Sequence, residues 1–198
     1  MKSLEKSALR IKNLSKKETD KFINRHILPN KDIVTIILKA HLYIEKLIED
    51  ILISSLAEPK IILKKNISFA KKVDLLEALG INNQIQSNIT KELRTTNKIR
   101  NNFVHNIEYK ITPNDINELL QGVSVPKSFN LRKKLISSLF RQIAYLQALR
   151  DICKERPFFF NCMRNKSLYV KDKTFNFKKI FDKDDLKNIV TFLEKLKY

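Results

Sequence analysis

Residues 98–106, with the sequence KIRNNFVHN, contain residue types that could act together on an RNA phosphodiester. Arg100 offers a planar set of donors suited to phosphate, and His105 exchanges protons near neutral pH. Asn101 is a neutral group that can orient either of them by a hydrogen bond. Metal-free cleavage of RNA needs a base for the ribose 2′-hydroxyl, a cation for the phosphorane and a proton for the leaving oxygen. This stretch therefore predicts a candidate ribonuclease site.

The spacing of the three residues suits one helix. Asn101 and His105 are four positions apart and share a helix face, whereas Arg100 lies about 140° from His105 and reaches that face through its long side chain. One imidazole would have to serve two proton transfers. A two-fold dimer with two such helices side by side would supply the second imidazole without additional sequence.

The same residues also have structural explanations. His105 could hydrogen-bond a terminal carbonyl of its helix and complement the helix dipole. Arg100 could form an ion pair with Glu45 or Glu49, which precede it on another predicted helix. On the residues alone, the catalytic and the structural explanations both stay open.

A long helix is predicted to begin after Asp32, a good N-cap residue, and to be closed by Pro59. Its apolar residues recur at helical spacing over a broad stripe, which predicts a central position in the fold. They are Ile33, Ile36, Ile37, Ala40, Ile44, Leu47, Ile48, Ile51 and Leu52.

Four further helices are predicted around it. One has Ser68 near its start and Gly80 just after its end, since glycine tolerates the left-handed conformation of a helix stop. The motif helix ends near His105 and has a buried side formed by Ile89, Leu93, Ile99 and Phe103. A short helix is expected to open at Asn114 or Asp115 and to close at Gly122. A long one follows with Leu131, Leu135, Leu139, Ile143, Leu146 and Leu149.

The composition supports an all-α fold, an up-and-down bundle of about four main helices with short extra helices. Hydrophobic residues make up 43% of the 198 residues, and only 2 Gly are present, which disfavours a turn-rich β protein. No apolar run is long enough for a membrane span, and the charged N-terminus has no signal core, so we expect a cytoplasmic protein. Cys153 and Cys162 are too few for a zinc site, and no metal or cofactor is expected.

The formal net charge of +18, from 39 Lys and Arg against 21 Asp and Glu, indicates a polyanionic partner such as RNA. A lysine-rich solvated surface is the alternative. Residues 1–31 are expected to form a helical extension, 32–156 the bundle and 157–198 a basic, aromatic appendage ending in a helix. This appendage is compatible with a small β-hairpin or an irregular strap. Candidate RNA contacts are Lys98, Lys166, Lys171, Lys173 and Lys178.

The stretch NKIRNNFVHN resembles the signature of the HEPN superfamily, and the segments AHLYIEKLIEDILISSL, ISFAKKVDLLEALGI and ELRTTNKIRNNFVHN follow the order of its mannitol-operon repressor-like branch. The resemblance covers about residues 33–150. It implies a helical bundle that dimerises across the motif helix and cleaves RNA without a metal, as toxin–antitoxin and antiviral members do. It also implies that Arg100 and His105 are catalytic, with Asn101 as their polar companion. Glu45 and His41 are candidates to support the same cleft.

The resemblance leaves two other roles open. Repressor-type members are regulators, so the domain could bind nucleic acid or protein without chemistry. A protein antitoxin or another regulatory partner would be a further expectation for a toxin.

Overall fold

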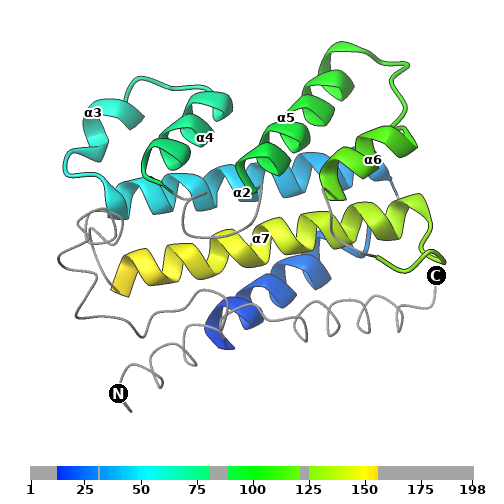
Figure 1. Cartoon of the computed structure of the whole chain (residues 1–198), viewed down its shortest axis with the longest axis horizontal. Helices are drawn as coiled ribbons and strands as arrows, with labels where there is room; N and C mark the ends of the chain where they lie inside the picture. The colour runs from blue at the N-terminus through cyan, green and yellow to red at the C-terminus, as the bar shows by residue number, and fades with distance from the viewer. Residues whose placement is uncertain (1–12, 31, 81–88, 121–124, 156–198) are drawn as a thin grey trace.

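The computed structural model describes residues 13–30, 32–80, 89–120 and 125–155, and it confirms the predicted all-α fold (Figure 1). No strand occurs among these residues. A helical segment over residues 13–22 continues into a π-helical turn, η1, and six α-helices follow. Their bounds are η1 Ile23–Ile27, α2 Ile33–Ser55, α3 Pro59–Leu63, α4 Phe69–Ala78, α5 Ile89–His105, α6 Pro113–Leu120 and α7 Leu131–Glu155.

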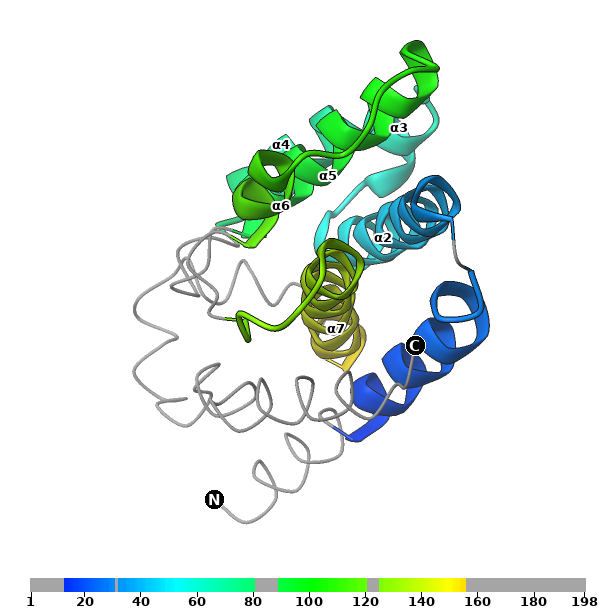
Figure 2. The same ribbon diagram turned by 90° about the vertical axis from the view of Figure 1, so that its right-hand side faces the viewer.

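The helices form three layers (Figures 1 and 2). The two long helices α2 and α7 lie side by side in the middle. The N-terminal segment with η1 packs on one side of this pair, and α3, α4, α5 and α6 form an outer layer on the other. The motif helix α5 therefore belongs to an outer layer, with its neighbours α4 and α6 on its two sides.

Helix α2 begins where the sequence predicts. The carboxylate of Asp32 accepts hydrogen bonds from the backbone nitrogens of Val34, at 3.2 Å, and Thr35, at 2.8 Å, so Asp32 is the N-cap. Every predicted apolar position of this helix is buried except Ile33, which is half-buried in the first turn. Each fully buried Ile or Leu contributes about 1.5–3 kcal/mol, and the middle layer is thus the main source of stability.

The stretch after α2 contains a short helix that the sequence pattern did not indicate. Pro59 does not close α2, which already ends at Ser55. It occupies the first turn of α3, where the N–H that proline lacks would have no helical partner anyway. The predicted start of α4 is confirmed, because the Ser68 hydroxyl accepts a hydrogen bond from the backbone nitrogen of Lys71. Gly80 follows α4 with φ 86°, a conformation that favours glycine.

Helix α6 begins earlier than predicted. Thr112, not Asn114 or Asp115, caps it, since the Thr112 hydroxyl accepts from the backbone nitrogen of Asp115 at 3.2 Å. The Asp115 carboxylate accepts in return from the backbone nitrogen of Thr112 at 2.8 Å. This reciprocal capping box, with Pro113 in the first turn, is the reason for the earlier start. The predicted closing residue, Gly122, lies outside the described residues.

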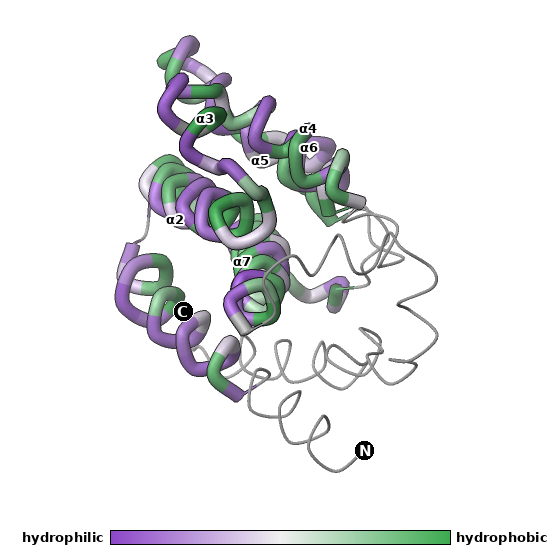
Figure 3. Tube along the Cα trace, turned by 90° about the vertical axis from the view of Figure 1, so that its left-hand side faces the viewer, coloured by the Kyte–Doolittle hydropathy of each residue, from purple (hydrophilic) through white to green (hydrophobic). Residues whose placement is uncertain are grey.

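The N-terminal helical segment is anchored to the middle layer at two points. The Ser15 hydroxyl donates to Asp151 of α7 at 2.9 Å, and the ring of Phe22 stacks on Tyr43 of α2 with centroids 3.9 Å apart. Figure 3 shows the hydrophobic residues of this segment on its inner side and the hydrophilic residues on its outer side. The predicted hairpin or strap, the C-terminal helix and four of the candidate RNA contacts (Lys166, Lys171, Lys173 and Lys178) lie outside the described residues.

Among the helices described, none combines the length and the apolar character that a bilayer crossing requires.

Candidate active site

Helix α5 presents its motif because its opposite side is held in the bundle. Leu93 and Ile99 are fully buried, and the Thr96 hydroxyl donates to Gln142 of α7 at 2.9 Å. These contacts fix the rotation of α5 about its axis. Arg100 and Asn101 consequently lie at the half-buried margin of the helix, where a solvent-borne ligand can reach them.

Arg100 and Asn101 form the organised part of the predicted site. Nη1 of Arg100 donates to Oδ1 of Asn101 at 2.9 Å. This bond orients the guanidinium with a neutral partner, so the positive charge is not cancelled by a carboxylate. Arg100 makes no ion pair with a described residue, and its remaining donors are therefore suited to an anionic ligand.

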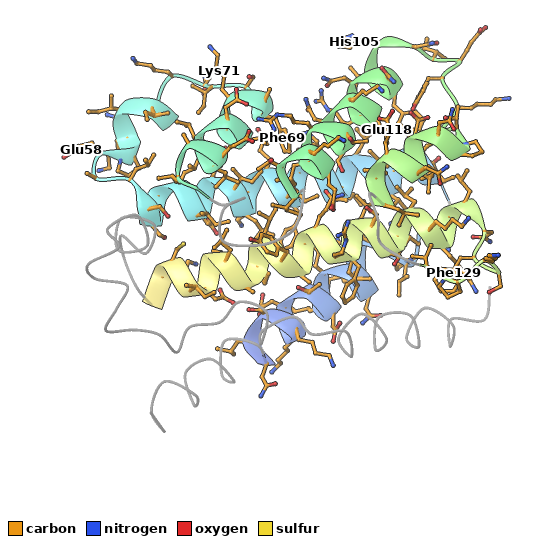
Figure 4. All side chains as sticks on the ribbon, in the orientation of Figure 1. Glu58, Phe69, Lys71, His105, Glu118 and Phe129 are labelled. Carbon is orange, nitrogen blue, oxygen red and sulfur yellow. The ribbon has the colours of Figure 1, made fainter. Side chains whose placement is uncertain are left out.

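His105 lies at the exposed end of α5 (Figure 4). The helix stops there, as predicted, because the next residue turns the chain: the Asn106 side chain accepts from the backbone nitrogen of Glu108 at 3.0 Å. Phe103 packs edge-on against Tyr109 and holds this turn on the bundle. The imidazole makes no hydrogen bond to a described residue, so the suggested bond to a terminal carbonyl is absent. No hydrogen bond links His105 to Arg100 among the bonds of the described residues.

His41, a candidate supporting residue, lies beneath the motif helix. Its Nε2 is 3.0 Å from Oδ1 of Asn97, one helical turn before Arg100 and Asn101. Its ring also packs against Phe69 of α4, with centroids 4.3 Å apart, and only 4% of the residue is exposed. Burial lowers the pKa of His41, and the charge of Arg100 lowers it further, against the opposing effects of Asn97 and Glu45. A neutral His41 therefore donates its Nε2–H to Asn97.

Glu45, the other candidate supporting residue, is paired with a lysine. Nζ of Lys72 donates to Glu45 at 2.6 Å and to Glu49 at 2.5 Å, joining α4 to α2. The suggested pairing of Arg100 with either glutamate is thus wrong, because both glutamates form ion pairs with Lys72 instead. Burial lowers the pKa of Lys72, but the two carboxylates outweigh it and the net pKa is raised, so this lysine stays charged.

The cations that flank Arg100 on α5 are bound by acidic residues of the neighbouring helices. Nη2 of Arg94 lies 2.8 Å from Asp74 and also pairs with Glu77, both on α4. Lys98, the predicted RNA contact within the described residues, lies 3.3 Å from Glu118 of α6 in an exposed pair. Such a pair contributes little and can open, so Lys98 stays a candidate contact.

Asn97, Phe69 and Lys72 were not singled out from the sequence. Asn97 could have been identified from the sequence, because it precedes Asn101 by four residues and therefore shares its helix face. No sequence pattern identifies Phe69 and Lys72, because their partners lie on a helix 23 or more positions away in the sequence. Only the packing of α4 on α2 reveals them.

The described residues contain no group of three or more His, Cys, Asp or Glu side chains arranged to hold a metal ion. Cys153 is buried and accepts a long hydrogen bond from the Ser55 hydroxyl at 3.6 Å. Burial raises the pKa of its thiol to about 11, as for a buried structural cysteine. Cys162 lies outside the described residues.

Comparison with known proteins returns no match: no family model, no curated protein and no solved structure is similar to this chain. The resemblance to HEPN proteins therefore rests on the motif and on the order of the three segments alone.

Proposed function

We propose that the protein is a metal-independent endoribonuclease of the HEPN type, acting as a toxin or antiviral effector. The observation that carries this proposal is the state of Arg100: a half-buried guanidinium oriented by Asn101, with no acidic partner in the described structure. A guanidinium oriented in this way can bind a phosphodiester and stabilise its pentacovalent transition state.

In the proposed reaction, the ribose 2′-hydroxyl attacks the adjacent phosphorus and the bond to the 5′-oxygen breaks. His105 takes the proton from the nucleophile or gives one to the leaving oxygen, and Arg100 stabilises the charge on the phosphorane. The products are a 2′,3′-cyclic phosphate and a free 5′-hydroxyl. The exposed position of His105 at the end of α5 suits a dimer in which the partner's His105 serves the second proton transfer.

The test compares two matched pairs of substitutions. Arg100→Ala and His105→Ala should each lower RNA cleavage by at least about 100-fold, the usual effect of removing such a group. Arg25→Ala and His26→Ala remove an exposed Arg and an exposed His from η1, in the opposite layer, and should leave cleavage unchanged. Cleavage that persists in the purified His105→Ala protein, or that disappears equally in His26→Ala, would exclude the assignment.

A non-catalytic regulator is the second candidate, and one observation favours it. Val104 and Ile107, on the two sides of His105, are 51% and 102% exposed, which is unusual for large apolar side chains. In this alternative, the end of α5 is a protein contact. Wild-type protein would leave RNA intact, and His105→Ala would lose partner binding. Expression in bacteria discriminates the two: toxicity of the wild type that His105→Ala relieves supports the enzyme.

A further inference from the structure

The segment from α3 to α4 is strongly basic. Residues 59–73 contain five lysines and no acidic residue. One of them, Lys72, is turned inward to Glu45 and Glu49. The other four are exposed and lack an acidic partner among the described residues: Lys60, Lys64, Lys65 and Lys71. We call these four residues the α3–α4 lysine surface.

This surface contrasts with two cations of α5 that lie before Arg100 in the sequence. On α5, Arg94 pairs with Asp74 and Glu77, and Lys98 pairs with Glu118. The positive charge of those helices is therefore partly neutralised in place, whereas that of the α3–α4 lysine surface is not. The lysine surface and Arg100 are among the cations of this layer that have no acidic partner in the described residues, so a phosphate chain could bind both.

A short chain of contacts joins the two places. Phe69, two residues before Lys71, packs its ring on His41. His41 is hydrogen-bonded to Asn97, which lies one turn before Arg100 on α5. Figure 4 shows Lys71 and His105 on the same outer edge of the layer, with Phe69 deeper between α4 and α5. Lys71 of the lysine surface and His105 of the motif thus lie on the same side of the molecule.

We propose that the α3–α4 lysine surface binds the phosphates of the RNA that flank the cleaved phosphodiester. The proposal rests on the ribonuclease function and adds where the substrate lies: it runs from the motif across α4 towards α3. Lysine contacts to phosphates carry no base information, so this surface would hold RNA of any sequence. An anionic membrane fits less well, because Ile61 is the one strongly exposed apolar side chain described on α3.

The experiment measures binding of a 5′-labelled, mixed-sequence single-stranded RNA by full-length His105→Ala protein, in which the probe stays intact. The test variant adds Lys64→Gln, Lys65→Gln and Lys71→Gln. The matched control adds Lys16→Gln, Lys17→Gln and Lys21→Gln, which remove the same charge from exposed positions in the opposite layer. Fluorescence anisotropy from about 50 to 200 mM salt gives Kd and its salt dependence.

The test variant should bind at least about tenfold more weakly. The slope of log K against log salt should become shallower by about 2, because each lost contact to a single strand accounts for about 0.7. The control should change Kd by less than about twofold, and replacing the three lysines by Arg should retain binding. Equal losses in both variants, or no loss in the test variant, would overturn the proposal. So would lysine-dependent binding to vesicles containing phosphatidylserine without any binding of RNA.

This readout is separate from cleavage. If wild-type protein cleaves RNA while the test variant binds normally, only the lysine surface fails. If wild-type protein does not cleave RNA but the test variant alone loses binding, the ribonuclease function fails and a nucleic-acid-binding surface remains.

Discussion

Nε2 of His41 lies 3.0 Å from Oδ1 of Asn97, and this contact ties the central helix α2 to the motif helix α5 one turn before Arg100. The ring of Phe69 covers the imidazole from α4. Three helices thus meet at one buried histidine. We infer that His41 positions the motif helix rather than touching substrate, because it is almost completely enclosed.

Replacing His41 should destabilise the fold. His41→Ala leaves the partly buried Asn97 oxygen without its donor, which costs about 1–3 kcal/mol of unfolding free energy. Urea unfolding measures this loss, and the exposed His26→Ala is the matched control with an expected change below about 0.5 kcal/mol. An unchanged midpoint for His41→Ala would show that the contact does not hold the helices together.

The protonation of His41 gives a second expected outcome. Its folded pKa is lowered by burial, so the unfolded chain binds the proton more readily. Stability should therefore fall as the pH drops below the unfolded value of about 6.5. NMR titration of the three histidines, with His41→Ala for assignment, should show that the His41 imidazole titrates below that value. If all three titrate at or above it, the neutral buried donor is ruled out.

Asn101 should control the charge that Arg100 presents. Asn101→Ala removes the orienting bond and should reduce cleavage by about tenfold, since the guanidinium remains but is less ordered. Asn101→Asp keeps the shape but pairs Arg100 with a carboxylate and should reduce cleavage by about 100-fold or more. Single-turnover rates on one RNA substrate compare the two. An Asp variant as active as the Ala variant would mean that the charge of Arg100 is not used.

Glu118 should weaken RNA binding by pairing with Lys98. Glu118→Gln frees this lysine and should tighten binding by up to about fivefold, the equivalent of an exposed pair worth at most about 1 kcal/mol. Lys98→Gln should weaken it, and the double substitution should resemble Lys98→Gln alone. Anisotropy titration at low salt checks this order. A Glu118→Gln effect that persists without Lys98 would indicate long-range charge instead.

Glu92 should make the stability depend on pH in the opposite direction to His41. Only 1% exposed, it faces Nη2 of Arg141 on α7 at 2.5 Å. Burial raises its pKa from 4.5 to about 7 despite this arginine, so the folded protein holds a proton that the unfolded chain releases. The contribution of this proton to the free energy of unfolding is fully present below pH 4.5 and is lost as the pH rises through about 7. It amounts to about 3 kcal/mol in total.

Glu92→Gln imitates the protonated side chain and should remove this decline. Denaturant unfolding from about pH 5 to 8 should show a smaller loss of stability in the variant than in the wild type. An equal decline in both proteins would mean that Arg141 keeps Glu92 ionised throughout.

Much of the helical framework could be predicted from sequence because its signals are local. Asp32 caps α2 through the residues that follow it, the apolar spacing predicts α2 as a central helix and α7 as a second long helix, and Ser68 begins α4. The start of α6 was predicted too late, because Thr112 and Asp115 form reciprocal capping bonds and the helix therefore begins before Asn114. The helix α3 was missed because five residues are too few for a periodic pattern.

By itself, the sequence determined that the chain is helical and basic, and that one helix ends in Arg100, Asn101 and His105. These properties depend on residue type and on spacings of a few positions, within reach of one turn. Only the tertiary structure decided which groups lie beside that helix. Lys72 rather than Arg100 neutralises Glu45 and Glu49, and His41 reaches Asn97 across 56 positions. Contacts between helices depend on how each helix is rotated and packed, and no local spacing encodes that.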